Sequence, residues 1–218
     1  MTGSAISDLM ALVCYLSESS NYLVCKMPST VMVPSIRACR AVWISAFNIK
    51  QVNVENVLQA VQQKAPDATV QLVDLESVPG SRYLLLATLN AIKSFRSKHA
   101  IARSLNMEML LYIAANRQIG EALKSVGVTN ATERVAVVAV ANTRTGVSDV
   151  VAALHTLFKV EDSDKLIDEW NTKRLQKVQT IFTIGDKELG AIKRKDEDQA
   201  KAVERLAIEK SAMLAIRR

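Results

Sequence analysis

The segment "RVAVVAVA" at residues 134–141 constrains the fold more than any other part of this chain. After Arg134 it holds only valine and alanine, with no polar residue to mark a face in contact with water. A strand with one exposed face alternates between apolar and polar residues, whereas a continuous apolar run suits a strand covered on both faces. We therefore predict a strand here that is covered on both faces.

The remaining segments predict a small sheet and many helices. Strands are indicated by "ACRAVWISAFNI" at 38–49, which is rich in β-branched and aromatic residues, and by the alternating "ATVQLVDL" at 68–75. Apolar residues at helical spacing predict helices between Asn53, a suitable N-cap, and Pro66, at 82–95, 100–114, 117–126 and 146–158, after Ser163, in a short segment that starts "IGDKELG", and at 198–216. Gly127 suits a left-handed position just past the end of the 117–126 helix. The pattern predicts an α/β (α+β) fold, with a small central mixed β-sheet packed with six or seven helices.

The length and hydrophobic content indicate one folded domain. A chain of 218 residues with 49% hydrophobic residues can bury a substantial core, and we expect that domain to span residues 38–218. Residues 1–37 are expected to be an N-terminal extension, either disordered or the product of a misassigned start. Asp8, rather than a basic region, precedes the apolar run at 9–16, which argues against a signal peptide.

No segment approaches the roughly 18 apolar residues of a membrane-spanning helix. The chain contains three cysteines, Cys14, Cys25 and Cys39. An odd number at wide spacing fits neither a disulfide framework nor a zinc site, so we expect reduced thiols in a cytoplasmic protein.

The sequence contains no recognisable catalytic constellation. Its seven glycines form neither G-x-G-x-x-G nor G-x-x-x-x-G-K, so no phosphate-binding loop is predicted. The two histidines, His99 and His155, are far apart and have no neighbour at metal-ligand spacing. We therefore expect no enzyme activity, no cofactor and no metal.

The helix expected at 100–114 is the most apolar of the set, and a helix that is apolar on most sides is expected to be central. Glu108 stands within this apolar run. The expectation for its carboxylate is that it reaches the surface or pairs with an arginine.

Basic residues gather at the corner between the helices expected at 82–95 and 100–114. The net charge of the chain is +6, which permits an acidic partner. Arg117 lies at the other end of the 100–114 helix, about 20 Å away at 1.5 Å per residue. The corner is either a solvated helix–helix connection or a surface that contacts nucleic-acid phosphates.

The segment "HAIARSLNMEMLLYIAANRQIGEALKSVGV" at 99–128 resembles the signature block of a known family. This is the PRPK-binding subunit family of the KEOPS (EKC) tRNA-modification complex, in which an "E-x-L-L-Y"-like run leads into "R-Q-I-x-x-A". Three further segments resemble the family in the same order: the one before this block, in which Tyr83 replaces the usual histidine, "FTIGDKEL" at 182–189, and "AVERLAIEKSAML" at 202–214.

The resemblance implies a non-catalytic regulatory subunit in the synthesis of threonylcarbamoyl-adenosine in tRNA. It implies that the chain binds and activates the small PRPK-like kinase/ATPase of the complex, contacts the other subunits indirectly, and binds the 3′ CCA end of tRNA. The residues whose chemistry and position suit tRNA are Lys93, Arg96, Lys98, Arg103, Asn116, Arg117 and Gln118. Those expected to contact the kinase are Ile119, Leu123, Leu206 and Met213, of which the last two are equally compatible with the core.

Two alternatives remain open from the sequence. The chain could be an α/β ligand-binding domain or small-molecule enzyme without a recognisable motif, or a purely structural partner of a kinase that has lost RNA binding. Arg117 is likewise compatible with an RNA contact or with a structural ion pair to Glu108.

Overall fold

The sheet has four strands, and the strand predicted to be covered on both faces lies inside it. The computed structural model describes residues 30–33, 40–49, 53–97, 99–160, 162–194, 197–214 and 216. The strands are β1 (Thr30–Val33), β2 (Arg40–Asn48), β3 (Thr69–Asp74) and β4 (Arg134–Ala141), in the spatial order β1-β2-β4-β3. Each described strand pair is antiparallel, so this part of the sheet is not mixed as expected.

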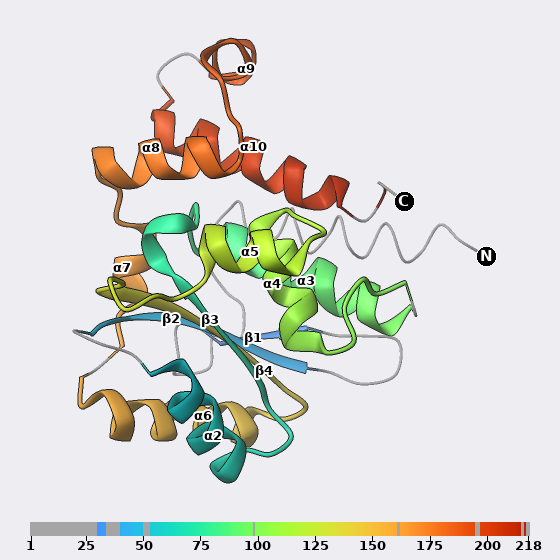
Figure 1. Cartoon of the computed structure of the whole chain (residues 1–218), viewed down its shortest axis with the longest axis vertical. Coiled ribbons are helices and arrows are strands. Elements are labelled where there is room, and N and C mark those ends of the chain that lie inside the picture. Colours follow the sequence, from blue (N-terminus) through green and yellow to red (C-terminus); the bar gives the residue numbers. More distant parts are fainter. Residues whose placement is uncertain are drawn as a thin grey trace, which may run out of the picture.

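Helices cover both faces of the sheet (Figure 1). One face carries α2 (Val54–Lys64) and α6 (Arg144–Phe158). The other side carries α3 (Ser81–Arg96), α4 (Leu105–Ala114), α5 (Ile119–Val126), α7 (Asp164–Asp168), α8 (Thr172–Ile181), α9 (Asp186–Ile192) and α10 (Gln199–Met213), with a short 3-10 helix, η1 (Leu75–Ser77), after β3. The predicted α/β class is confirmed, and the described residues form nine α-helices where six or seven were expected.

Strand β4 shows why its sequence is apolar throughout. Alternate residues point to opposite faces of a strand. Val135 and Val137 join the core beneath α2 and α6, whereas Ala136 and Val138 join the core that contains α3 and α4. Both sets are fully buried, so neither face of β4 has a place for a polar side chain.

Two local expectations about helix ends have different outcomes. Asn53 is the N-cap of α2, as predicted, because its Oδ1 accepts a hydrogen bond from the amide of Asn56 at 3.0 Å. The prediction of a left-handed Gly127 is wrong, since its φ is −68° and its ψ is 152°. A Cβ at this glycine would lie 2.3 Å from the carbonyl oxygen of Leu123, so close backbone approach excludes a side chain here.

Part of the segment expected to be an N-terminal extension belongs to the sheet. Residues 30–33 form β1, which pairs with β2 so that Thr30 faces Trp43 and Val33 faces Arg40. The expected domain start at residue 38 therefore leaves out one strand. Residues 1–29, with Cys14 and Cys25, lie outside the described part of the chain, as does Cys39, so the expectations for them remain predictions.

Helix α4 is the centre of the core on its side of the sheet. Met109, Leu110 and Leu111 are fully buried, which confirms the prediction of a central helix. The terminal carbonyls of this helix find partners on two neighbouring helices. The Tyr83 hydroxyl of α3 donates to the carbonyl of Ile113 at 2.8 Å, and the Ser211 hydroxyl of α10 donates to that of Tyr112 at 2.8 Å. Burial raises the pKa of the Tyr83 hydroxyl, which keeps it protonated as a donor.

Carboxylates from α7 and α10 meet at the beginning of α3. Asp168 accepts hydrogen bonds from the Ser81 amide at 2.9 Å and the Ser81 hydroxyl at 2.8 Å, while Glu204 accepts one from the Tyr83 amide at 3.3 Å. These acceptors satisfy free amides at a helix N-terminus and complement its dipole. Burial, together with the charge of Asp168, raises the pKa of Glu204 above its ordinary value.

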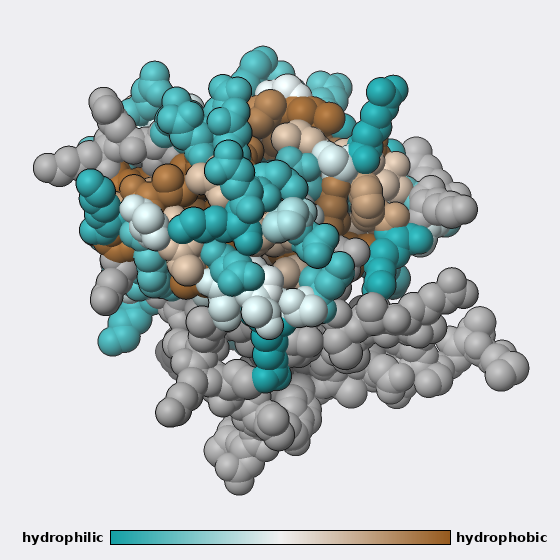
Figure 2. All heavy atoms as spheres, turned by 90° about the horizontal axis from the view of Figure 1, so that it is seen from below, coloured by the Kyte–Doolittle hydropathy of each residue, from teal (hydrophilic) through white to brown (hydrophobic). Residues whose placement is uncertain are grey.

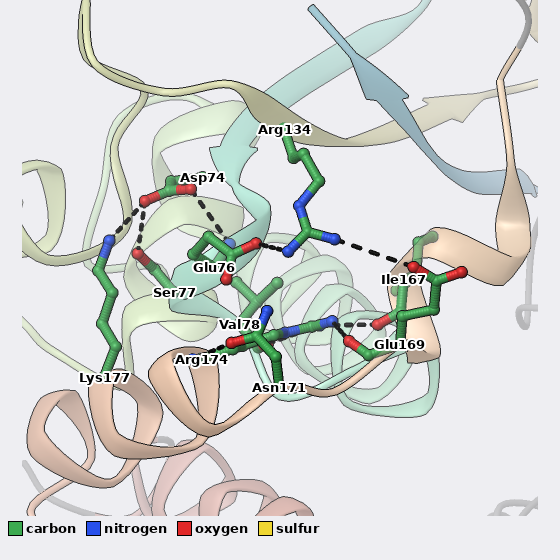
Figure 3. A network of polar contacts seen from close by, with 10 residues as sticks. All are labelled: Asp74, Glu76, Ser77, Val78, Arg134, Ile167, Glu169, Asn171, Arg174 and Lys177. Carbon is green, nitrogen blue, oxygen red and sulfur yellow. Dashed lines mark hydrogen bonds and ion pairs between the residues drawn. The ribbon is translucent and has the colours of Figure 1, made fainter.

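A buried arginine attaches α8 to the loops around it (Figure 3). The Arg174 guanidinium, which is fully buried, donates to the carbonyl oxygens of Val78 at 2.9 Å and Ile167 at 2.7 Å, and to that of Glu169. Burial lowers the pKa of Arg174 to about 10, with the charges of nearby carboxylates opposing the shift. The side chain thereby replaces water for the carbonyl groups of the buried residues Val78 and Ile167, which would otherwise lack a donor.

Ion pairs surround this arginine and join the sheet to the C-terminal helices. Arg134, at the start of β4, pairs with Glu76 and lies 3.9 Å from a carboxylate oxygen of Glu169. The Lys177 ammonium of α8 lies 2.6 Å from a carboxylate oxygen of Asp74, at the end of β3. These polar contacts are directed at other parts of the same chain, so we interpret the network as a scaffold.

Replacing Arg174 should destabilise the fold strongly. Arg174→Ala leaves buried carbonyl groups without donors and opens a cavity, so we expect a loss of about 3–5 kcal/mol in the free energy of unfolding, measured by urea denaturation. The neighbouring exposed Lys173 provides the matched control, since Lys173→Ala should stay within about 0.5 kcal/mol of the wild type. A loss below about 1 kcal/mol for Arg174→Ala would contradict the scaffold role.

The raised pKa of Glu204 predicts a pH dependence of stability. Because the folded state holds this proton more tightly than the unfolded state, the contribution of Glu204 is fully present below its ordinary pKa of 4.5 and is lost as the pH rises through the folded pKa. Glu204→Gln keeps an acceptor for the Tyr83 amide but does not titrate. Urea denaturation between pH 4 and pH 7 should therefore show the variant gaining stability relative to the wild type as the pH rises, and a constant difference would refute this prediction.

Candidate functional site

The described residues offer surfaces rather than an evident reaction centre. Within the ranges given above, the structure places no group of three or more histidine, cysteine, aspartate or glutamate side chains where a metal ion could be held. No helix in the same ranges has both the length and the apolarity needed to cross a membrane. The candidate residues from the sequence lie in two places, near the two ends of the buried helix α4.

Helix α5 carries an apolar face that is only half covered. Ala122 and Val126 are buried, whereas Ile119 and Leu123 are 41% and 46% exposed. At 3.6 residues per turn, these four positions fall within about 100° of the helix circumference. The apolar face of α5 therefore extends from the core out into the solvent, as expected of a helix that binds a partner.

The beginning of α5 lies near the end of α10. Arg117, two residues before Ile119, donates from Nη1 to the carbonyl oxygen of Leu214 at 3.3 Å. Next to that carbonyl, Met213 is 41% exposed, and Ile216 is 71% exposed. We call Ile119, Leu123, Met213 and Ile216 the α5–α10 patch; the comparison of the sequence with the family did not single out Ile216.

Leu206 does not belong to the α5–α10 patch. It was expected to contact the kinase, but it is only 6% exposed and packs in the core that contains α3 and α4. The sequence left open whether Leu206 belongs to the core or to a kinase-binding surface, and the structure places it in the core. Its helical neighbours Val203 and Ala207 are buried with it.

The second group of candidates lies at the corner between α3 and α4. Lys93 and Arg96, in the last turn of α3, and Arg103, in the following loop, are exposed. Cations in the last turn of a helix also complement its dipole, so the two α3 residues suit the fold as well as an anionic partner. Lys98 lies outside the described residues.

Hydrogen bonds fix the backbone of this corner from both sides. On the α3 side, the Ser94 hydroxyl donates to the carbonyl oxygen of His99 at 3.3 Å, and the His99 amide donates to the Ser94 carbonyl at 3.3 Å. On the α4 side, Oε2 of Glu108 accepts from the amides of Ile101 at 2.9 Å and Ala102 at 2.7 Å. We call the described residues from 93 to 104 the α3–α4 corner.

Two expectations about Glu108 and its helix are wrong. Its side chain is fully buried rather than at the surface, and its carboxylate accepts hydrogen bonds from backbone amides rather than from an arginine. The helix expected at 100–114 begins at Leu105. The amides of Ile101 and Ala102 are oriented toward the carboxylate, and residues 101–104 form bends instead of a first helical turn.

The three tRNA-binding candidates at 116–118 also have structural roles. The Oδ1 atom of Asn116 accepts from the amide of Gln118 at 2.9 Å, and Gln118 is the N-cap residue of α5. Arg117 precedes the helix, and its bond to the Leu214 carbonyl places its charge at the C-terminal, negative end of α10. This explains an arginine beside a helix start, where the dipole of α5 alone would disfavour it.

The predicted tRNA residues therefore form two separate groups. The residues at the α3–α4 corner and those at 116–118 lie at opposite ends of α4, a helix of ten residues and hence about 15 Å long. Sequence reasoning missed Glu108, Tyr83 and Ser211 as the residues that hold the two ends of α4. A carboxylate within an apolar helix was the available signal for the first; the other two look like ordinary helical residues.

Comparison with known proteins identifies the family. A comparison with curated proteins finds no match. The family model described as "Kinase binding protein CGI-121", the family of the KEOPS Cgi121 subunit, matches residues 48–215. This range contains the α3–α4 corner, the α5–α10 patch apart from Ile216, and the block at 99–128 that carried the resemblance, and it covers most of the 218 residues. The resemblance is thereby confirmed: the chain belongs to the CGI-121 family of kinase binding proteins.

Proposed function

We propose that this chain is a non-catalytic regulatory subunit of a KEOPS complex that binds and activates the small kinase/ATPase of that complex. In this role it works in the cytoplasm, takes part in the synthesis of threonylcarbamoyl-adenosine in tRNA, and meets the other subunits through the kinase. The observation that carries the proposal is the α5–α10 patch, an exposed apolar surface on a member of a kinase-binding family.

The patch has the properties of a protein-binding surface. It combines two isoleucines, a leucine and a methionine, whose side chains bury apolar area on contact. The flexible methionine side chain also adapts to the shape of a partner. On the neighbouring polar face of α5, Lys124 pairs with Glu121 at 2.8 Å, so these charges can stay in water when the apolar face is covered. The bond between Arg117 and Leu214 holds the two parts of the patch together before a partner binds.

We further propose that the α3–α4 corner contacts the tRNA, with the 3′ CCA end as the bound element. Lys93, Arg96 and Arg103 supply exposed cations, the groups that contact phosphates in most protein–RNA interfaces. The fixed backbone of the corner supports this role, because ordering a loop on binding would reduce the affinity. Arg117 and Gln118 remain candidates at the other end of α4. The corner is the stronger candidate because its cations are exposed, whereas Arg117 binds the Leu214 carbonyl and Gln118 is the N-cap of α5.

A charge introduced into the α5–α10 patch should weaken kinase binding. Leu123→Asp would bury an unpaired carboxylate in the interface, so we expect the dissociation constant for the cognate kinase to rise at least about 30-fold, measured by isothermal titration calorimetry. The stimulation of ATP hydrolysis by the kinase should fall in parallel. The melting temperature should change little, because Leu123 is exposed.

The matched control lies on the opposite side of the sheet. Leu157, near the end of α6, is 39% exposed, close to the value for Ile119. Figure 2 shows the side of the molecule that carries α2 and α6, where hydrophilic side chains spread across the surface and separate the hydrophobic areas. Leu157→Asp should leave kinase affinity unchanged within about twofold. Equal losses for both variants, or no loss for Leu123→Asp, would contradict the proposed kinase surface.

Charge reversal at the α3–α4 corner should weaken tRNA binding. For the double variant Arg96→Glu and Arg103→Glu we expect at least about a tenfold loss of affinity for intact tRNA in filter binding at 0.1 M salt, and a smaller dependence of affinity on salt concentration. Lys64→Glu, on the exposed end of α2, is the control and should lose far less. If tRNA without its CCA end binds the wild type as tightly as intact tRNA, the assignment of the CCA end is wrong; if neither binds, RNA binding itself is wrong.

A further inference from the structure

We propose that Glu108 is a positioning residue for tRNA binding. It acts from inside the protein by holding the backbone of the α3–α4 corner, so that the exposed cations of the corner are presented to phosphates. The inference rests on the proposed tRNA function of the corner and adds to it the buried group on which that function depends.

The geometry places the carboxylate directly under the corner. Glu108 is fully buried in the first turns of α4, and its Oε2 accepts the amides of Ile101 and Ala102 at 2.9 and 2.7 Å. Its other oxygen, Oε1, has no hydrogen-bond partner among the described residues. Hydrogen bonds to a charged acceptor are about twice as strong as neutral ones, so the two amides are held firmly.

The Glu108 carboxylate keeps residues 101–104 out of the helix that the apolar spacing of the sequence favours. The apolar spacing at 100–114 suits a helix that would start five residues earlier than α4 does. A helix over 101–104 would wind Arg103 into its first turn, where a cation opposes the dipole. By binding the two amides, Glu108 keeps these residues in bends and leaves Arg103 exposed on the corner.

A buried carboxylate is not needed for the stability of such a helix. Burying a charge has a large desolvation penalty, and an apolar residue of similar size in a core is often as stable or more so. The dipole of α4 and two amides offset that penalty here, but the neighbouring residues Met109 and Leu110 show that the site is otherwise apolar. The presence of a carboxylate at this buried position is therefore explained by the backbone of the α3–α4 corner, which it holds in place.

The charge of Glu108 and its hydrogen bonds predict opposite effects on RNA affinity. A negative charge beneath a phosphate-binding surface repels the ligand, so removing it should tighten binding if only the charge matters. If Glu108 positions the corner, removing the charge should weaken binding, because neutral hydrogen bonds hold the two amides less firmly. The sign of the change in affinity thus separates the two roles.

The test uses Glu108→Gln, which keeps the size of the side chain. We expect its affinity for intact tRNA to fall about tenfold in filter binding, whereas its affinity for the cognate kinase stays within about twofold, because the α5–α10 patch lies at the other end of α4. Hydrogen–deuterium exchange should become faster at the amides of Ile101 and Ala102. Glu55→Gln, which removes an exposed charge on α2, is the control and should change none of these quantities.

A second variant, Glu108→Asp, keeps the charge but is one methylene shorter. The positioning role predicts a loss of tRNA affinity for this variant too, whereas a pure charge effect predicts none. Tighter tRNA binding by Glu108→Gln, or equal losses of tRNA and kinase affinity, would overturn the inference. If neither variant folds, Glu108 is needed for the fold itself, and that outcome also contradicts the inference. A wild-type chain that binds no tRNA would remove the proposed RNA function and this inference with it.

Discussion

The burial of α4 from Glu108 to Ala114 is the constraint on which the rest of the structure depends. A helix with so little contact with water must find donors and acceptors for its ends inside the protein. Tyr83 from α3 and Ser211 from α10 donate to its last carbonyls, and Glu108 binds the amides that precede its first turn. These bonds bring distant parts of the chain to the two ends of one buried helix.

Each end of α4 therefore supports a different surface. Near its C-terminal end, α10 packs against α4, and Arg117, which precedes α5, binds the Leu214 carbonyl just after α10. Near its N-terminal end, Glu108 and Ser94 fix the α3–α4 corner. The α8 region is attached separately, through the buried Arg174, so it supports the scaffold without taking part in either surface (Figure 3).

The sequence predicts the layers of this fold well because they follow from repeated apolar patterns. The burial of β4 on both faces, the buried helix α4 and the Asn53 cap each depend on residues close together in the chain. Glu108, Gly127 and Leu206 were predicted less well, because their outcomes depend on atoms that only the folded structure brings near. The antiparallel pairing of β1 with β2 is likewise a tertiary result that no local pattern of the chain encodes.

The central claim is that the kinase covers the α5–α10 patch. Hydrogen–deuterium exchange of this chain, alone and saturated with its cognate kinase, tests it without any substitution. The account predicts slower exchange at the amides of α5 and of the last two turns of α10, and unchanged exchange in α2 and α6. Protection confined to α2 and α6, with α5 and α10 unaffected, would contradict it.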